Sequence, residues 1–361
     1  MLFDVNPKEK TSDLYDRKRE LEELHSSVKR GERLSVVYGV RRIGKTSLIH
    51  TFLSQKEVPY SFIDARQIYM ESSSVPPQKL YQAIFENFFN FAMKFGGETE
   101  ESLSKKYPTM FSGDEMPSLL RDINDWCKGK RISYVIVFDE AQYLRFGGSV
   151  KYDVMIAWSI DNLSNVTYML TGSEIGMLKE FLKYEDVDAP LYGRFRNEIY
   201  LEKFDKETAS KFLEKGFNET GKRVSKEEIN GVIAMIGGIV GWLTYYGHYR
   251  CVDGLNHEKA LKKVFDEGSK IVVKEIETLI SKSRARYLSI LRSISEGTDT
   301  WSGIKRRAVG DAGTIPDTRL NALLQQLVKF GIVDKTGDER YSIIDPITLS
   351  AVKKMGKVNK P

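Results

Sequence analysis

One stretch constrains this chain more than any other: Gly39-Val40-Arg41-Arg42-Ile43-Gly44-Lys45-Thr46. It has the form G-x-x-x-x-G-K-T, a loop that surrounds phosphate groups with backbone N–H donors. An apolar run, 34–38, precedes it and a helical pattern begins at Ser47. Because a helix N-terminus favours negative charge, this strand–loop–helix order suits phosphate binding. We therefore expect residues from Gly39 to Ser47 to bind a nucleotide, with Lys45 on the β- and γ-phosphates and Thr46 on Mg²⁺.

A second signal is an acidic pair at the end of an apolar run. Residues 135–138 are all apolar, as in a parallel strand covered on both faces, and Asp139 and Glu140 follow. We expect Asp139 to bind Mg²⁺ and Glu140 to polarise the water that attacks the γ-phosphate. The alternative is an acidic pair that only favours a helix N-terminus.

Two further candidates follow along the chain. The predicted strand 166–171 is followed by Gly172 and Ser173. A polar side chain at this tip would lie near the γ-phosphate; Ser173 is the first candidate and Thr171 the second, with a turn serine as the alternative. Arg194 precedes a last predicted strand, 198–201, and is a candidate to stabilise phosphoryl charge within its own subunit or across an interface. The alternative is a surface arginine on a loop.

Strands that alternate with helices predict a doubly wound α/β fold with a parallel sheet over residues 1–203, with the nucleotide at the carboxyl ends of its strands. Within it, 80–95 has a helical pattern and 96–113 reads as a polar connection. The strand signal disappears after 203, so we expect a helical lid domain over 204–283. Residues 284–361 have the pattern of a winged helix-turn-helix domain.

The charge is distributed unevenly. Residues 284–361 contain 14 Lys and Arg against 8 Asp and Glu, whereas the rest of the chain contains 41 against 42. The positive excess therefore lies in the predicted winged helix, which favours a polyanion as partner. A solvated basic face is the alternative.

The third helix of this domain is predicted to start at Pro316 and stop at Gly331, and 332–344 to form the wing. Its outward side chains are of types that suit base edges and phosphates of double-stranded DNA. They are Arg319, Gln325, Gln326, Lys329 and, less clearly, Asn321. Docking of a protein partner is the alternative.

The rest of the composition narrows the class of protein. The two cysteines, Cys127 and Cys251, exclude a disulfide framework, and no apolar run approaches the ~20 residues that span a bilayer. Residues 1–10 lack the apolar core of a signal peptide. We expect a cytoplasmic protein without a membrane partner.

The combined pattern resembles the archaeal ATPase family, a branch near the STAND and AAA+ P-loop ATPases, from about Leu14 to Asp345. Three stretches carry the resemblance beyond the phosphate loop and the acidic pair: Tyr15-Asp-Arg17-Lys-Arg-Glu-Leu21, where Asp16 replaces a glycine; Leu191-Tyr-Gly-Arg194; and Gly237-Gly-Ile-Val-Gly-Trp-Leu243, where Val240 replaces a proline. The resemblance implies that Arg17 lies at the nucleotide site and that the nucleotide is ATP.

We thus expect a slow, Mg²⁺-dependent ATPase that binds ATP and ADP and acts as a switch whose winged helix binds DNA. ATP would clamp the ATPase domain and the lid together, and a nucleotide-dependent oligomer is a further expectation. The first alternative is a nucleotide-binding regulator with weak hydrolysis whose winged helix docks a protein. A helicase-like motor is the second, although no further helicase motif is visible.

Overall fold

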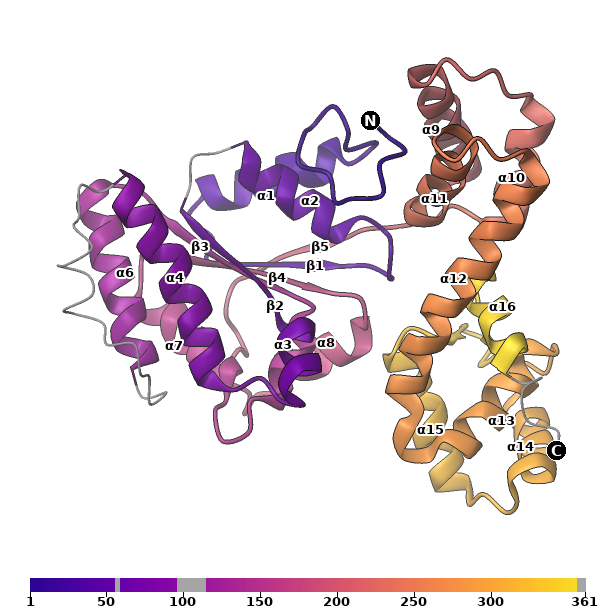
Figure 1. Ribbon diagram of the computed structural model, residues 1–361. Helices are drawn as coiled ribbons and strands as arrows, with labels where there is room; N and C mark the ends of the chain where they lie inside the picture. Colours follow the sequence, from indigo (N-terminus) through magenta and orange to yellow (C-terminus); the bar gives the residue numbers. More distant parts are fainter. Residues whose placement is uncertain (56–58, 96–114, 356–361) are drawn as a thin grey trace. The chain divides into compact units, whose positions relative to one another are not determined.

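The computed structural model of the protein describes residues 1–55, 59–95 and 115–355 (Figure 1). Contacts divide the chain into two compact units: unit 1 comprises Met1–Pro7, Arg41–Gly44 and Glu202–Pro361, and unit 2 comprises Lys8–Val40 and Lys45–Leu201. The predicted polar connection, 96–113, lies outside the described residues. The predicted boundary at 283/284 falls inside unit 1 and stays a prediction.

A parallel sheet forms the centre of unit 2, and its described strands run in the order β2-β3-β4-β1-β5. These are β1 (Leu34–Tyr38), β2 (Tyr60–Asp64), β3 (Tyr134–Asp139), β4 (Val166–Gly172) and β5 (Asn197–Tyr200). The order confirms the predicted doubly wound P-loop fold. In this order β4 lies between the strand of the phosphate loop and the strand of the acidic pair.

Helices cover both faces of this sheet (Figure 1). The first face carries α1 (Lys18–Lys29) and α2 (Lys45–Ser54) and the second carries α4 (Pro77–Phe95), α6 (Met116–Lys130) and α7 (Tyr152–Asn162). Shorter helices follow three of the strands. They are α3 (Ala65–Ser72) after β2, the 3₁₀ helix η1 (Ala141–Phe146) after β3 and α8 (Ile175–Leu182) after β4. The sequence patterns predicted α2 and α4 but not α3, α7 or α8.

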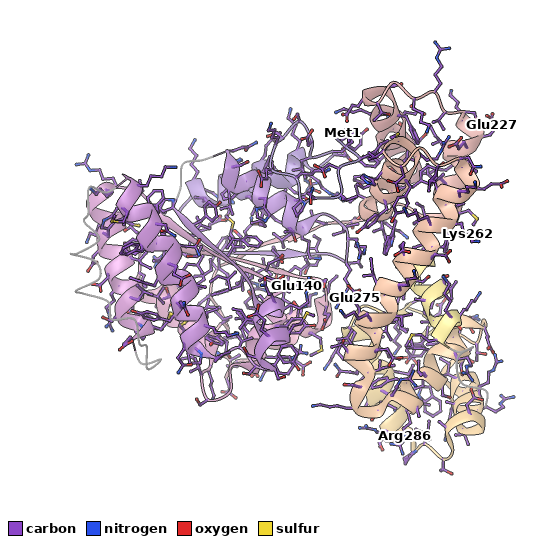
Figure 2. The ribbon with its side chains drawn as sticks, in the orientation of Figure 1. Met1, Glu140, Glu227, Lys262, Glu275 and Arg286 are labelled. Carbon is purple, nitrogen blue, oxygen red and sulfur yellow. The ribbon has the colours of Figure 1, made fainter. Side chains whose placement is uncertain are left out.

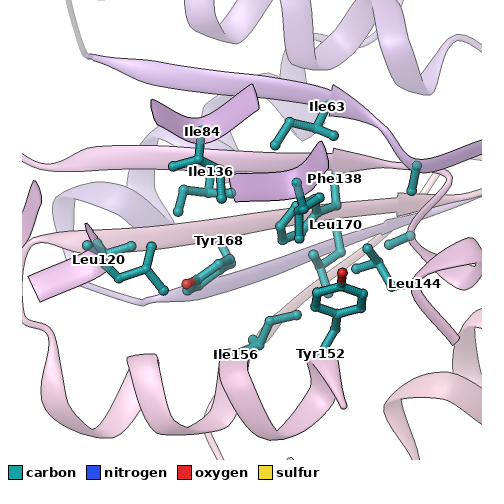
Figure 3. Packing of buried hydrophobic residues seen from close by; sticks show 14 of the residues in the cluster. Ile63, Ile84, Leu120, Ile136, Phe138, Leu144, Tyr152, Ile156, Tyr168 and Leu170 are labelled. Atoms are coloured by element: carbon teal, nitrogen blue, oxygen red, sulfur yellow. The ribbon is translucent and has the colours of Figure 1, made fainter. Parts of the chain in front are cut away.

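Every second residue of the strands contributes to the core between the sheet and the helices on its second face. Figure 3 shows Phe138 of β3 and Tyr168 of β4 on the side of α7, which contributes Ile156; all three are fully buried. The Tyr168 hydroxyl lies 3.0 Å from Ser159 Oγ of α7, so its polar end is also satisfied. Buried side chains of β3 and β4 thereby pack the centre of the sheet against α7.

Unit 1 is built mainly of helices. It contains α9 (Lys206–Glu219), α10 (Lys226–Ile236), α11 (Val240–Cys251), α12 (His257–Ile280), α13 (Arg284–Ser295), α14 (Trp301–Ala312), α15 (Asp317–Lys329) and α16 (Pro346–Met355). The strands β6 (Asp334–Lys335) and β7 (Tyr341–Ser342) form the wing, which is shorter than predicted. The winged helix is thus confirmed, whereas α16, which packs against α12, was not predicted.

Local capping explains where two of these helices begin. Asp205 accepts a hydrogen bond from the Thr208 N–H at 2.7 Å, and Ser225 accepts one from the Glu228 N–H at 3.1 Å. Each bond satisfies a backbone donor that the first helical turn leaves unpaired.

None of the helices within the described ranges is long and apolar enough to cross a membrane.

The N-terminal segment of unit 1 is anchored by one aromatic ring. Phe3 is fully buried, and its ring centroid lies 5.9 Å from that of Phe212 and 5.2 Å from that of Phe217. A Cβ atom at Gly216 would lie 2.3 Å from this ring, and one at Gly247 2.2 Å from it. The ring therefore fits because α9 and α11 carry glycines where they face it.

We predict that Phe3→Ala lowers the free energy of unfolding by about 3 kcal/mol, because it empties an enclosed aromatic site. Urea denaturation of the purified protein measures this change. The matched control is Phe195→Ala, since Phe195 is 72% exposed and its removal opens no cavity. Equal denaturation midpoints for the two variants would contradict the anchoring role of Phe3.

Candidate active site

The candidate site lies at the carboxyl ends of β1, β4 and β3, which are adjacent in the sheet. Each strand leads directly into a segment with polar groups: the phosphate loop after β1, Gly172 and Ser173 at the end of β4, and Glu140 after β3. Figure 2 labels Glu140. Parallel strands bring such ends to one edge of the sheet, where α/β proteins bind ligands.

Lys45 opens α2, and only 5% of it is exposed. Its ammonium group donates to the carbonyl oxygens of Gly39 at 2.8 Å and Val40 at 3.1 Å, so the side chain folds back over the start of the loop. Gly44, just before it, has φ +99°, in the left-handed region that favours glycine. The loop therefore needs its second glycine for the backbone path that places Lys45.

Asp139 connects the three strands. Its Oδ2 atom accepts a hydrogen bond from Thr46 Oγ1 at 2.9 Å, and its Oδ1 atom accepts one from the hydroxyl of Thr171. A carboxylate beside a threonine hydroxyl offers the hard oxygen ligands that Mg²⁺ prefers. Thr46 and Asp139 therefore fit the metal predicted from the sequence, and Thr171 lies in the same group.

Glu140 is held at both its backbone and its side chain. Its φ is +53°, and its N–H donates to Thr171 Oγ1 at 3.3 Å. The carboxylate, only 7% exposed as a residue, accepts at Oε2 from Ser173 N–H at 3.0 Å, Ser173 Oγ at 2.7 Å and Gln142 Nε2 at 2.7 Å. The structure thus brings Ser173 to the carboxylate of Glu140, and Thr171 to the carboxylate of Asp139 and the backbone N–H of Glu140.

The two candidate arginines of unit 2 have other partners. Arg17 precedes α1, is 7% exposed and donates to Glu20 at 3.4 Å. Arg194 forms an ion pair with Asp161 of α7, and its guanidinium lowers the pKa of that carboxyl.

The middle of the phosphate loop, Arg41–Gly44, groups with unit 1. The Arg42 guanidinium lies 4.4 Å above the Trp242 ring, and Arg41 forms an ion pair with Glu275 at 2.9 Å. The Gly241 N–H donates to the Arg42 carbonyl at 2.9 Å, and a Cβ at Gly241 would lie 2.7 Å from the Arg42 Cβ. The Gly241-Trp242 pair of the sequence signature therefore contacts this loop directly.

Two residues of the site, Gln142 and Asp64, were not predicted from the sequence. Gln142 has no recognisable motif, because its role depends on the turn of η1. Asp64 ends β2, Tyr60–Asp64, and lies in register with Asp139 of β3. Burial raises the pKa of Asp64, the Arg66 guanidinium and the Gln67 N–H oppose this, and the carboxylates of Asp139 and Glu140 raise it further.

The outer face of α15 presents the predicted polar residues to different degrees. Arg319 and Gln325 are exposed, and Gln326 and Lys329 are half-buried. Arg319 donates to Ser283 Oγ at 2.9 Å, while Asn321 accepts from Trp301 Nε1 at 2.6 Å. The helix therefore has a polar outer face opposite the buried leucines Leu320, Leu323, Leu324 and Leu327.

This sheet, phosphate loop and acidic pair define a Walker-type ATPase with a C-terminal winged helix. Residues 14–245 match the family described as an ATPase domain predominantly from Archaea, and the chain belongs to that family. Residues 281–344 match the C-terminal winged helix-turn-helix domain of MCM proteins.

Solved structures agree with this assignment. The chain is similar to a Walker-type ATPase of Pyrococcus abyssi, with 33% identity and a TM-score of 0.87 over 98% of this chain and 100% of the other. The Aeropyrum pernix ORC2 protein, in ADPNP and ADP complexes, shares the fold at 15% identity, with a TM-score of 0.66 over 98% and 96% of the two chains. Among curated proteins the comparison found no match.

We predict that Asp64→Asn stabilises the protein at pH 7. A raised pKa means that the folded protein holds the Asp64 proton more tightly than the unfolded chain, so stability falls as pH rises from about 4 through the folded pKa. Asparagine keeps the cap that Asp64 provides to Gln67 but has no charge to bury.

Urea denaturation at several pH values tests this, and the advantage of Asp64→Asn should shrink as the pH falls toward 4. Asp125→Asn, an exposed position on α6, is the control and should show little change. A destabilised Asp64→Asn protein at pH 7 would contradict the prediction.

Proposed function

We propose that the protein binds ATP and ADP and hydrolyses ATP in a Mg²⁺-dependent reaction, as a slow nucleotide-controlled switch. The observation that carries this proposal is the convergence of Lys45, Thr46, Asp139 and Glu140 at the ends of three adjacent strands. A phosphate-binding loop beside two buried carboxylates is the arrangement that ATP hydrolysis requires.

In this proposal the loop from Gly39 to Ser47 surrounds the phosphates with N–H groups, and Lys45 neutralises the β- and γ-phosphates. Lys45 would exchange its bonds to the Gly39 and Val40 carbonyls for phosphate oxygens. Thr46 and Asp139 would hold Mg²⁺, which neutralises charge on the β- and γ-phosphate oxygens when it is bound.

Glu140 is the proposed base. Its carboxylate would accept a hydrogen bond from the water that attacks the γ-phosphorus and orient that water. Ser173, bonded to the same carboxylate, would connect Glu140 with the γ-phosphate. Arg17 and Arg194 are proposed to contact the nucleotide, which for Arg194 requires its ion pair with Asp161 to open.

We further propose that the winged helix binds double-stranded DNA through the outer face of α15. The positive excess of residues 284–361 and the exposure of Arg319 and Gln325 support this. Cations on this face would neutralise phosphates, and the glutamines would contact base edges.

We predict that Glu140→Gln retains ATP binding but slows hydrolysis by about 10² or more, because the amide cannot accept the proton of the water. ATP affinity is measured by titration with a fluorescent ATP analogue, and turnover by phosphate release. Lys45→Ala is the opposite control: it removes the loop's ammonium group and should weaken Mg-ATP binding by about tenfold or more. Equal losses of binding and turnover in Glu140→Gln would show that Glu140 is structural.

For DNA binding, we predict that affinity falls steeply with salt, with a log–log slope of about −0.9 per phosphate contacted. Arg319→Ala combined with Lys329→Ala should weaken binding and make this slope shallower, while ATPase activity without DNA is unchanged. Fluorescence anisotropy with a labelled duplex measures both quantities.

Arg319→Gln combined with Lys329→Gln separates charge from helix propensity, since glutamine is a good helix former. If the wild-type protein shows no salt-dependent DNA binding at low ionic strength, with or without ATP, the DNA proposal fails. Docking of a protein partner would then be the remaining function of this face.

A further inference from the structure

Gln142 is buried in η1, two residues beyond the proposed base, and the ATPase motifs assign it nothing. We propose that its side-chain amide is a positioning residue that fixes the Glu140 carboxylate in the orientation needed to activate water. The inference rests on the proposed ATPase function. It begins with the 2.7 Å bond from Gln142 Nε2 to Glu140 Oε2.

The direction of this bond is fixed by chemistry. A carboxylate only accepts, so the NH₂ group of Gln142 must face Glu140 and the carbonyl oxygen must point away. That carbonyl, Oε1, is buried and has no hydrogen-bond partner within the described chain. A Cβ at Gly172 would lie 2.8 Å from it, so the end of β4 leaves space for this amide. Gln142 is thus oriented by its contact with Glu140.

Packing alone is a poor explanation for an amide at this place. Gln142 is fully buried, and a buried amide loses free energy unless its polar atoms find partners. An apolar side chain of the same length would fill the volume without that cost. The single described contact that compensates the amide is the one to Glu140.

Two separate elements hold the same carboxylate oxygen. Gln142 approaches from η1, and Ser173 donates twice from the end of β4. The Glu140 backbone is also held, since its N–H is bonded to Thr171. With backbone and carboxylate both anchored, the remaining rotations of the side chain are restricted. A base held in this way needs no reorientation at the moment of reaction, and small misplacements of such groups reduce rates strongly.

The test is Gln142→Met, which keeps the length of the side chain and removes the donor. We expect kcat to fall about tenfold with the Kd for Mg-ATP unchanged. Gln82→Met is the matched control: Gln82 also donates to a glutamate, Glu86, at 2.7 Å, but it lies exposed on α4. That variant should keep the wild-type kcat.

The second arm repeats Gln142→Met in the Glu140→Gln background, with enzyme in excess over ATP. If Gln142 acts through Glu140, the double variant should be no slower than Glu140→Gln alone. An additional loss of the same size would show a merely structural role and overturn the proposal. So would a wild-type or raised kcat in Gln142→Met. Should Gln142→Met fail to fold, as seen by urea denaturation, Gln142→Asn replaces it, since it withdraws the donor by one methylene and keeps the amide.

Hydrolysis by the wild-type protein distinguishes the proposed ATPase function from the proposed role of Gln142. Absence of wild-type hydrolysis in a single-turnover measurement would contradict the proposed ATPase function itself. Wild-type hydrolysis together with an unaffected Gln142→Met variant would leave the ATPase function standing and remove only the role of Gln142.

Discussion

The carboxylate of Asp139 is the group on which the rest of the site depends. It ends β3 and accepts hydrogen bonds from Thr46, which follows the loop after β1, and from Thr171 of β4. Burying a carboxylate without such donors would cost folding free energy. The two threonine hydroxyls offset that cost when the ends of β1, β3 and β4 come together. The order β3-β4-β1 makes this possible, because it brings Thr171 of β4 and the start of α2, which carries Thr46, to the end of β3.

Around this carboxylate, the chemical groups lie on rigid elements. Lys45 and Thr46 belong to the first turn of α2, and Asp139 is the last residue of a fully buried strand. Glu140 takes the left-handed conformation at the junction of β3 and η1, and this turn redirects the chain at the edge of the sheet. Residues on helix ends and strand ends are positioned more accurately than residues on long loops, which suits the proposed orientation of a water molecule by Glu140.

The sequence predicted the parts of this structure that depend on local pattern. The spacing of Gly39, Gly44 and Lys45 indicated the phosphate loop, and the apolar run before Asp139 indicated a buried strand. It did not predict α7 or α16, whose short helical patterns are weak without the surfaces they cover. Nor did it predict the pairing of Arg194 with Asp161 or of Gln142 with Glu140, because these depend on the folded backbone path.

The strand order has a consequence for how this protein forms. The strand of the phosphate loop, Leu34–Tyr38, pairs with Tyr168–Gly172 and Asn197–Tyr200, so it has no described neighbour from its own part of the chain. Contacts between residues so far apart in the sequence form slowly, because the chain loses the entropy of closing a large loop before the contacts contribute favourable free energy. During synthesis, the phosphate loop leaves the ribosome long before its sheet partners exist. The proposed nucleotide site is therefore complete only after β4 has been made.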